Sequence, residues 1–233
     1  MSIVLVTGTG TDIGKTIGTA ALAAALREEG KEVHVVKPIQ TGFPGPNGGD
    51  LDTVAELTGI DNLHGFVRYP EPMAPVAAAQ RAGMRLPNAT EIAEKIKLID
   101  GPNRVVLVEG AGGLLVRLGE DWALPELAAL LPGSQMVVVT RLDLGCLNEA
   151  ELTVEVARGR GVNVTALVGG SLPVDVDPII ETNLDELPRI TGVPLLGGGA
   201  GRSGSVDAAG VCGESYAVAA GRARVGRSAV KAL

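Results

Sequence analysis

A glycine-rich segment near the start of the chain could bind phosphate groups. Residues 8–16 read GTGTDIGKT, between a β-branched run at residues 3–7 and an amphipathic pattern at residues 17–29. Glycines let backbone N–H groups turn inward, and the following helix presents the positive end of its dipole. Lys15 can neutralise the β- and γ-phosphates, and the Thr16 hydroxyl can hold magnesium. The segment therefore predicts a nucleoside triphosphate site.

The spacing of this loop departs from the standard pattern G-x-x-x-x-G-K-[ST]. That pattern needs glycine at position 9, whereas this chain has Thr9 between Gly8 and Gly10, which adds one residue to the loop. A GTP-binding protein would also carry an Asn/Thr-Lys-x-Asp element after a later strand. Residues 139–143 read VTRLD, without the lysine. The sequence favours ATP and leaves other triphosphates open.

Two further polar segments follow predicted strands. Lys37 follows the run at residues 33–36, within KPIQTG, and Glu109 follows the run at residues 105–108, within VEGAGG. Parallel strands bring their carboxyl ends to one edge of a sheet, so we expect Lys37 and Lys15 to share one anion pocket. An ionised carboxylate at the end of an apolar strand needs a cation or donors, which suits Glu109 to a direct or indirect magnesium contact.

These segments, together with GGDLD at residues 48–52 and LGCLN at residues 144–148, resemble the dethiobiotin synthetase family in type and in order. The resemblance extends from residue 3 to residue 171. It implies a ligase that uses ATP and Mg²⁺ to form the cyclic urea of dethiobiotin from 7,8-diaminopelargonate (7,8-diaminononanoate) and CO2. The implied intermediates are a carbamate and a carbamic-phosphoric anhydride, and the products include ADP and phosphate.

The resemblance also implies site residues. Thr16, Asp50 and Glu109 correspond to magnesium contacts, with Asp52 as the rival of Asp50. The implied nucleotide contacts are Thr11, Asp12, Ile13, Gly14, Lys15, Thr16, Ile17, Asp50, Glu109, Gly110, Ala111, Gly112, Gly170, Ser171, Gly197 and Gly198. The last four are expected after two strands, near the base. Backbone contacts to a base tolerate many side chains, so a plain glycine-rich turn remains the alternative there.

At the substrate, the resemblance implies Lys37 and Lys15 as the catalytic cations and places Lys37 and Thr41 at the diamine. It places Leu147 and Asn148 near the substrate carboxylate, contributed across the two-fold interface of a homodimer. Relatives often carry His where this chain has Glu149, which changes the charge at that end of the site.

The periodicity of the chain predicts the fold that would position these residues. Six β-branched runs, at residues 3–7, 33–36, 105–108, 136–140, 164–168 and 193–196, alternate with helical patterns at residues 17–29, 51–57, 90–99 and 149–158. Such alternation predicts a single-domain α/β P-loop fold spanning residues 1–233, with a mostly parallel sheet and helices on both faces. Residues 43–49 are expected to form an exposed loop, residues 206–220 a helix, and the last dozen residues to be disordered.

Composition excludes several other classes. Hydrophobic residues make up 45% of the chain and aromatic residues only 2%, which suits a parallel sheet and not an aromatic-rich RNA or sugar binder. A net charge of −7 argues against nucleic-acid and anionic-membrane partners. The two cysteines lie at no spacing that suggests a zinc site or a disulfide framework, and the sequence shows no signal or membrane segment, which predicts a cytoplasmic protein.

Two rival functions use related folds. A partitioning or cluster-assembly ATPase would act as a nucleotide switch, but such proteins generally carry a second lysine in the phosphate loop, where this chain has only Lys15. Another amide- or urea-forming ligase of the same superfamily would act on a larger carboxylate substrate, but such chains usually add a glutamine-hydrolysing domain, which needs a nucleophilic cysteine and far more than 233 residues. We expect His34, His64 and Cys146 to be structural.

Overall fold

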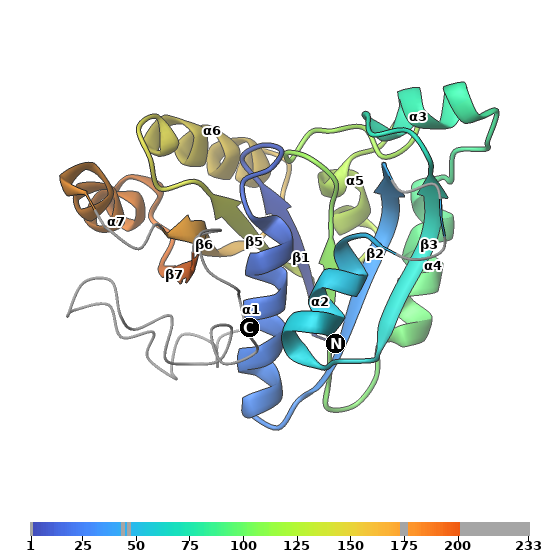
Figure 1. The fold of residues 1–233 in the computed structure, drawn as a ribbon, viewed down its shortest axis with the longest axis horizontal. Helices are drawn as coiled ribbons and strands as arrows, with labels where there is room; N and C mark the ends of the chain where they lie inside the picture. Colours follow the sequence, from blue (N-terminus) through green and yellow to red (C-terminus); the bar gives the residue numbers. More distant parts are fainter. Residues whose placement is uncertain (1, 43–44, 46–47, 173–176, 201–233) are drawn as a thin grey trace.

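The chain forms one parallel sheet between two layers of helices (Figure 1). The computed structural model describes residues 2–42, 45, 48–172 and 177–200. The strands are β1 (Ile3–Gly8), β2 (Glu32–Thr41), β3 (Leu63–Tyr69), β4 (Arg104–Glu109), β5 (Gln135–Thr140), β6 (Val164–Leu172) and β7 (Leu195–Ala200). Neighbouring strands pair in parallel, in the order β3-β2-β4-β1-β5-β6-β7. The predicted α/β fold class is confirmed.

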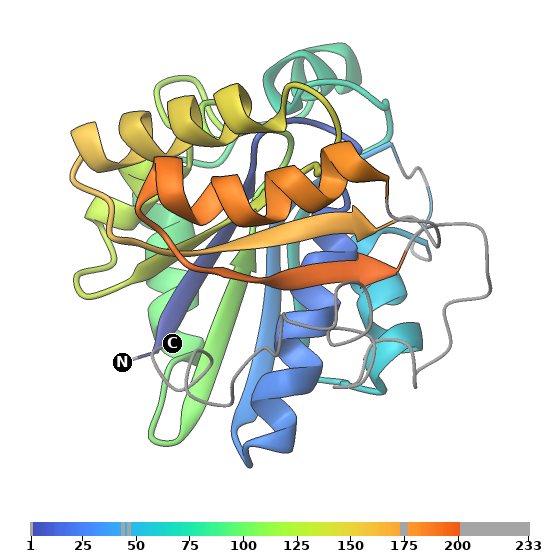
Figure 2. The ribbon, with the colours of Figure 1, turned by 90° about the vertical axis from the view of Figure 1, so that its left-hand side faces the viewer.

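The helices divide between the two faces of the sheet. They are α1 (Lys15–Glu28), α2 (Asp50–Thr58), α3 (Pro75–Ala82), α4 (Ala89–Ile99), α5 (Leu124–Ala129), α6 (Cys146–Gly159) and α7 (Pro178–Thr191). Helices α1 and α2 cover one face, and α3 to α7 cover the other. Figure 2 shows α6 and α7 side by side over one face, with α1 on the opposite side. No helix among the described residues is long and apolar enough to cross a membrane.

The hydrophobic core has two parts because successive strand residues point to opposite faces. In β1, Ile3 and Leu5 pack on the side of α3 to α7, whereas Val4 and Val6 pack on the side of α1 and α2. Every residue of β1 is buried, as expected for the central strand of a parallel sheet. The strand that leads into the phosphate loop is therefore fixed by β4 and β5 at its edges and by helices on both faces.

Several elements differ from the sequence prediction. Strand β3 was not predicted, because it is an edge strand of mostly half-buried residues and lacks a continuous apolar run. Helices α3, α5 and α7 were not predicted either, and α7 contains Pro188, which weakens its helical signal. The run at residues 193–196 begins the seventh strand only at Leu195, and β7 continues through glycines that have low strand propensity. Parallel pairing with β6 fixes that strand.

Strand β2 is longer than predicted, and this moves Lys37 from a loop into the strand. Pro38 is tolerated because β2 pairs with β4 only over residues 32–36, so beyond them the strand has β3 as its partner on one side. Residues 43–44 and 46–47 of the predicted loop, the predicted helix at residues 206–220 and the chain's last dozen residues lie outside the described residues.

Candidate active site

The phosphate loop connects β1 to α1 and is held in an unusual backbone conformation. Gly14 has φ +89° and Asp12 has φ +55°, the left-handed region that glycine adopts without strain. The ammonium group of Lys15 donates a 2.8 Å hydrogen bond to the carbonyl oxygen of Gly10. The Thr9 amide donates to the carbonyl oxygen of Val139 at 3.0 Å, which ties the loop to the end of β5. The protein's own hydrogen bonds thus hold the loop in this conformation.

Two glycine segments pack directly against the phosphate loop. A Cβ atom added at Gly170 of β6 would overlap the carbonyl oxygen of Ile13, and one added at Gly14 would overlap the carbonyl oxygen of Gly170. On the other side, a Cβ atom at Gly113 would lie 3.4 Å from the carbonyl oxygen of Gly8. Only glycine permits this approach of the β6 backbone to the loop.

The glycine pairs predicted at the base lie elsewhere than expected. Gly170 and Ser171 lie within β6, and Gly197 and Gly198 lie within β7, so both pairs are inside strands and not after them. Gly198 is paired with Gly169 across the two strands. Gly170 and Ser171 lie near the carboxyl end of β6, and Gly197 and Gly198 lie in the middle of β7. Contacts to a base stay a prediction.

Lys37 is the best-buried cation near the loop, with 3% of its surface exposed. Its Nζ atom lies 2.5 Å from Oδ2 of Asp50 and 2.8 Å from Oε1 of Glu109, and donates to the carbonyl oxygen of Gly110 at 2.8 Å. Burial by itself lowers the pKa of Lys37, but the charges of Glu109 and Asp50 outweigh burial and raise the pKa. Lys37 is therefore a fixed ammonium group at neutral pH.

The predicted magnesium contacts meet at the same place. The Thr16 hydroxyl donates to Oε1 of Glu109 at 3.0 Å, and Glu109 is 2% exposed. Lys37 links Glu109 to Asp50. Asp52 instead lies 3.7 Å from Arg68 Nη2. The geometry thus brings Asp50, and not Asp52, to Glu109.

The donor set suits magnesium. Among the described residues no group of three or more His, Cys, Asp or Glu side chains is arranged to hold a metal ion. Thr16, Asp50 and Glu109 instead offer two carboxylates and a hydroxyl, all oxygen donors. Mg²⁺ commonly takes one or two carboxylates and completes its shell with water and phosphate oxygens. The residues present fit that ion.

The two lysines of the site influence one another. Burial lowers the pKa of Lys15, and the positive charge of Lys37 lowers it further, although Glu109, Asp50 and Asp12 act in the opposite sense. An incoming polyanion would interact strongly with this group of two ammonium groups and two carboxylates. Lys15 and Lys37 therefore lie in one electrostatic environment, and their sharing of an anion pocket stays a prediction.

Two supporting residues were not anticipated. Oε1 of Gln40 accepts a 3.1 Å hydrogen bond from the Asp50 amide, which fixes the first residue of α2 beside Lys37. Arg68 donates to the carbonyl oxygens of Gly45 and Gly48, at 3.2 and 2.7 Å, in the segment that leads to Asp50. Gln40 lies inside the KPIQTG motif, so its position was a usable signal, but Arg68 lies on the unpredicted strand β3.

The predicted substrate residues lie on two sides of the phosphate loop. Thr41 ends β2, on the same side of β1 as Lys37, whereas Leu147 and Asn148 lie on the first turn of α6, after β5. Leu147 is partly buried against the core and Asn148 is exposed. One chain therefore does not place the two groups side by side.

Comparison with known proteins identifies the family. The AAA domain family matches residues 3–198. An ATP-dependent dethiobiotin synthetase of Corynebacterium kroppenstedtii is 53% identical over 197 residues, covering 84% of this chain and 85% of that protein. A protein of the same name from Corynebacterium diphtheriae is 48% identical over 212 residues, covering 91% and 94%. Another, from Mycobacteroides abscessus, is 44% identical over 195 residues, covering 84% and 85%.

Solved structures resemble the fold at low identity. The cell division ATPase MinD of Pyrococcus furiosus has a TM-score of 0.54 at 20% identity, covering 99% of this chain and 95% of that one. MinD of Pyrococcus horikoshii, complexed with Mg-ADP, has a TM-score of 0.55 at 18% identity, covering 99% and 93%. This likeness shows the nucleotide-binding fold alone. The sequence relatives are far closer, and they show that the chain belongs to the family of ATP-dependent dethiobiotin synthetases.

Proposed function

We propose that the chain forms the ureido ring of dethiobiotin from 7,8-diaminopelargonate and CO2, with ATP converted to ADP and phosphate. The observation that carries this proposal is the meeting of Lys37 with Asp50 and Glu109, beside the phosphate loop and its Lys15. A nucleotide switch needs the loop, but it does not need a second buried ammonium group from another strand. A ligase that joins an anionic carbamate to a phosphoryl group does.

The reaction assigns a charge-stabilising role to the two lysines. One amine of the substrate attacks CO2 and loses a proton, which gives a carbamate. A carbamate oxygen then takes the γ-phosphoryl group, and ADP leaves. The second amine attacks the carbamate carbon, the carbon–oxygen bond to phosphate breaks, and the ring closes as a proton is lost. Lys37 and Lys15 would stabilise the negative charge on the carbamate and the transferred group.

Thr16, Asp50 and Glu109 would hold Mg²⁺. The ion would neutralise charge on the β- and γ-phosphates. In the structure these same carboxylates bind the Lys37 ammonium, at 2.5 and 2.8 Å. The two carboxylates thus already bind one cationic group, which supports a cation site built from these oxygens. Lys37 and Thr41 would then face the diamine from the β2 side.

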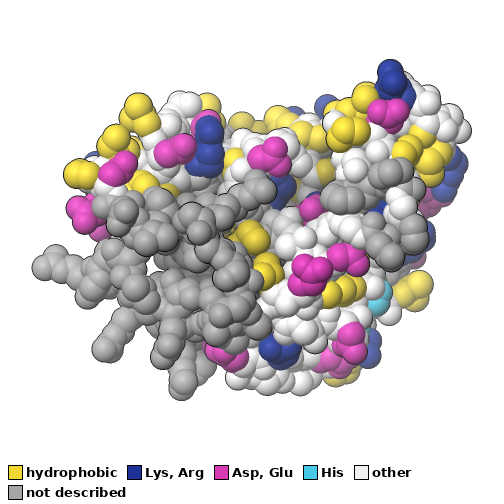
Figure 3. Space-filling model, viewed as in Figure 1, with side chains coloured by type: hydrophobic (Ala, Val, Ile, Leu, Met, Phe, Trp, Pro, Cys, Tyr) yellow, Lys and Arg dark blue, Asp and Glu magenta, His cyan; other side chains and the backbone are white. Residues whose placement is uncertain are grey.

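A homodimer would complete the substrate site. Leu147 and Asn148 begin α6 on the far side of the phosphate loop from Lys37, which supports their serving the site of a partner subunit. Two exposed leucines flank them in the sequence: Leu144 is 81% exposed and Leu152 is 53% exposed. Figure 3 shows hydrophobic side chains along the margin of the molecule over α6. Such apolar exposure is typical of a surface that pairs with another.

Mixing two inactive variants tests the shared site. Lys37→Gln and Asn148→Ala should each inactivate the chain, and mixed dimers should regain activity because one of their two sites is intact. Absence of recovery, after subunit exchange has been shown with differently tagged chains, would argue against a site shared between subunits.

One assay tests the proposed reaction. The purified protein is incubated with ATP, Mg²⁺, bicarbonate and 7,8-diaminopelargonate, and dethiobiotin and phosphate are measured. We expect both to form in equal amounts and to depend on the diamine. ATP hydrolysis at a rate independent of the diamine, without formation of dethiobiotin, would instead support the nucleotide-switch alternative that the MinD-like fold allows.

A further inference from the structure

An ion pair borders the phosphate loop on the β5 side. Arg141 directly follows β5, and its Nη2 atom donates a 2.7 Å hydrogen bond to Oε1 of Glu149 on the first turn of α6. Asp143 lies 3.7 Å from Arg141 Nε, so two carboxylates share one guanidinium group. Neither Arg141 nor Asp143 has a part in the proposed reaction.

The second oxygen of Glu149 faces the phosphate loop. Oε2 of Glu149 lies 3.5 Å from the hydroxyl of Thr9, at the outer limit of a hydrogen bond. Thr9 stands where the standard pattern needs its first glycine, and its amide donates to the carbonyl oxygen of Val139 of β5. The Thr9 side chain therefore brings the phosphate loop into contact with the Arg141–Glu149 pair.

This position has an electrostatic consequence. A triphosphate in the loop carries several negative charges, and a carboxylate that touches the loop repels them. The guanidinium of Arg141 offsets that repulsion, because it is bound directly to the carboxylate. The side chains of Arg141 and Glu149 are 46% and 34% exposed, so the pair adds little to folding stability. The location of the pair beside the phosphate loop instead suggests an effect on nucleotide binding.

We propose that Arg141 and Glu149 form a charge pair that sets the affinity of the phosphate loop for its nucleotide. The proposal rests only on the nucleotide-binding part of the proposed function, and it does not depend on ring closure. Loss of Arg141 leaves the Glu149 carboxylate unneutralised against the loop, so the nucleotide binds more weakly. Loss of the Glu149 charge leaves a guanidinium beside the loop, so the nucleotide binds more tightly.

Calorimetry with ATP and Mg²⁺ tests this opposition of signs. In Arg141→Gln we expect Kd to rise about fivefold, and in Glu149→Gln we expect it to fall about threefold. The double variant should return to within about twofold of the wild-type value, because the two charge changes cancel. Raising the salt concentration from about 0.05 M to about 0.5 M should shrink both single effects, since both are electrostatic and partly exposed.

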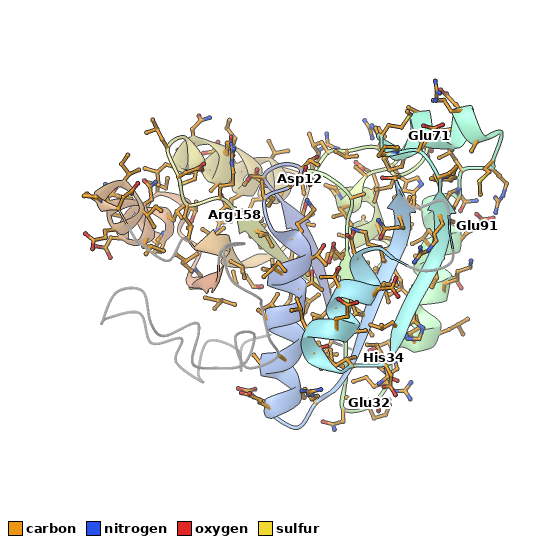
Figure 4. All side chains as sticks on the ribbon, in the orientation of Figure 1. Asp12, Glu32, His34, Glu71, Glu91 and Arg158 are labelled. Carbon is orange, nitrogen blue, oxygen red and sulfur yellow. The ribbon has the colours of Figure 1, made fainter. Side chains whose placement is uncertain are left out.

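The chain offers a matched control pair at the opposite edge of the sheet. Arg104 Nε lies 3.1 Å from Glu32 Oε1, and these side chains are 36% and 45% exposed. Figure 4 shows Glu32 at the opposite end of the molecule from Asp12 of the phosphate loop. Arg104→Gln and Glu32→Gln make the same changes in net charge and should leave Kd within about twofold of wild type.

Two results would overturn the proposal. One is a shift of Kd in the same direction in Arg141→Gln and Glu149→Gln, which would indicate a packing role without charge specificity. The other is a Kd unchanged in both variants. If the wild-type chain itself binds no ATP, the nucleotide site fails as well, so the two failures can be told apart.

Discussion

Strand β2 carries two buried ionisable side chains, His34 near its amino end and Lys37 at its middle, and only Lys37 lies among groups that resemble an active site. His34 lies near the amino end and is 7% exposed, and Lys37, three residues later, is 3% exposed. His34 Nδ1 lies 3.0 Å from His64 Nε2, and His34 Nε2 lies 2.9 Å from Oε1 of Glu32. The imidazole rings stack with their centroids 5.3 Å apart. Both ring nitrogens of His34 are thus occupied by neighbouring side chains of β2 and β3.

Lys37 is bound by groups that come from other parts of the chain. Asp50 starts α2, Glu109 ends β4, and the phosphate loop follows β1. At this edge strands end, loops begin and a helix presents its amino end, so backbone and side chains can approach a ligand together. At the opposite edge the polar groups satisfy one another. Buried polar residues therefore indicate an active site where they come from several chain segments that can also contact a ligand.

The largest expected effect is at the carboxyl edge. Lys37→Gln should reduce turnover by about 100-fold or more while the ATP affinity changes by less than about threefold, because the lost charge acts on the transferred group. Steady-state kinetics and ATP calorimetry measure the two quantities. Lys31→Gln is the control, since Lys31 precedes the same strand and is exposed. Unchanged turnover in Lys37→Gln would remove the functional distinction between the two edges.

Asp50 and Asp52 should differ in their contribution to metal binding. Asp50→Asn should weaken Mn²⁺ binding in the presence of ADP by about 10- to 100-fold, whereas Asp52→Asn should change it by less than about threefold. The reason is that Asp50 meets the Glu109 group through Lys37, and Asp52 lies near Arg68. Electron paramagnetic resonance of free Mn²⁺ measures the affinity. A larger effect from Asp52→Asn would reverse the choice between the two ligands.

The backbone contact between β6 and the phosphate loop gives a third test. Gly170→Ala should lower stability by about 1–3 kcal/mol and weaken ATP binding, because a Cβ atom there overlaps the Ile13 carbonyl oxygen. Gly159→Ala is the control, since a Cβ atom at Gly159 meets nothing within 4 Å. Thermal unfolding and calorimetry compare the two variants. Equal stability of Gly170→Ala and wild type would mean that the loop can move away from β6 without cost.

Much of this arrangement could be predicted from the sequence because it depends on local patterns. The β-branched runs predicted six of the seven strands that the described residues form, and the polar residues after those runs indicated which edge of the sheet carries the charges. The predicted family is confirmed by the sequence relatives, and the predicted fold class is confirmed by the sheet topology. The roles of the site residues stay predictions, although the structure brings Thr16, Lys37, Asp50 and Glu109 together.

Other features depend on tertiary contacts that no local pattern reveals. Strand β3 is stabilised by pairing with β2, and its own residues are mostly half-buried. Lys37 lies inside β2 because Pro38 is free of a partner on the β4 side, which depends on where β4 ends. His64 lies in the unpredicted strand β3, where it meets His34. The contact of Gly170 with Ile13 joins residues far apart in sequence.

The smallest expected effect is at the amino edge and concerns pH. Burial lowers the pKa of His64 below its usual value of 6.5, and the charge of His34 lowers it further. The unfolded chain therefore binds a proton at a higher pH than the folded chain. The stability linked to neutral His64 is complete above pH 6.5 and is lost as the pH falls toward the lowered pKa of the folded state. Wild-type protein should lose about 1–2 °C more in Tm than His64→Gln between pH 7.5 and about 5.5. Parallel pH profiles of Tm in the two proteins would contradict this, and would show that His64 is as readily protonated in the folded chain as in the unfolded one.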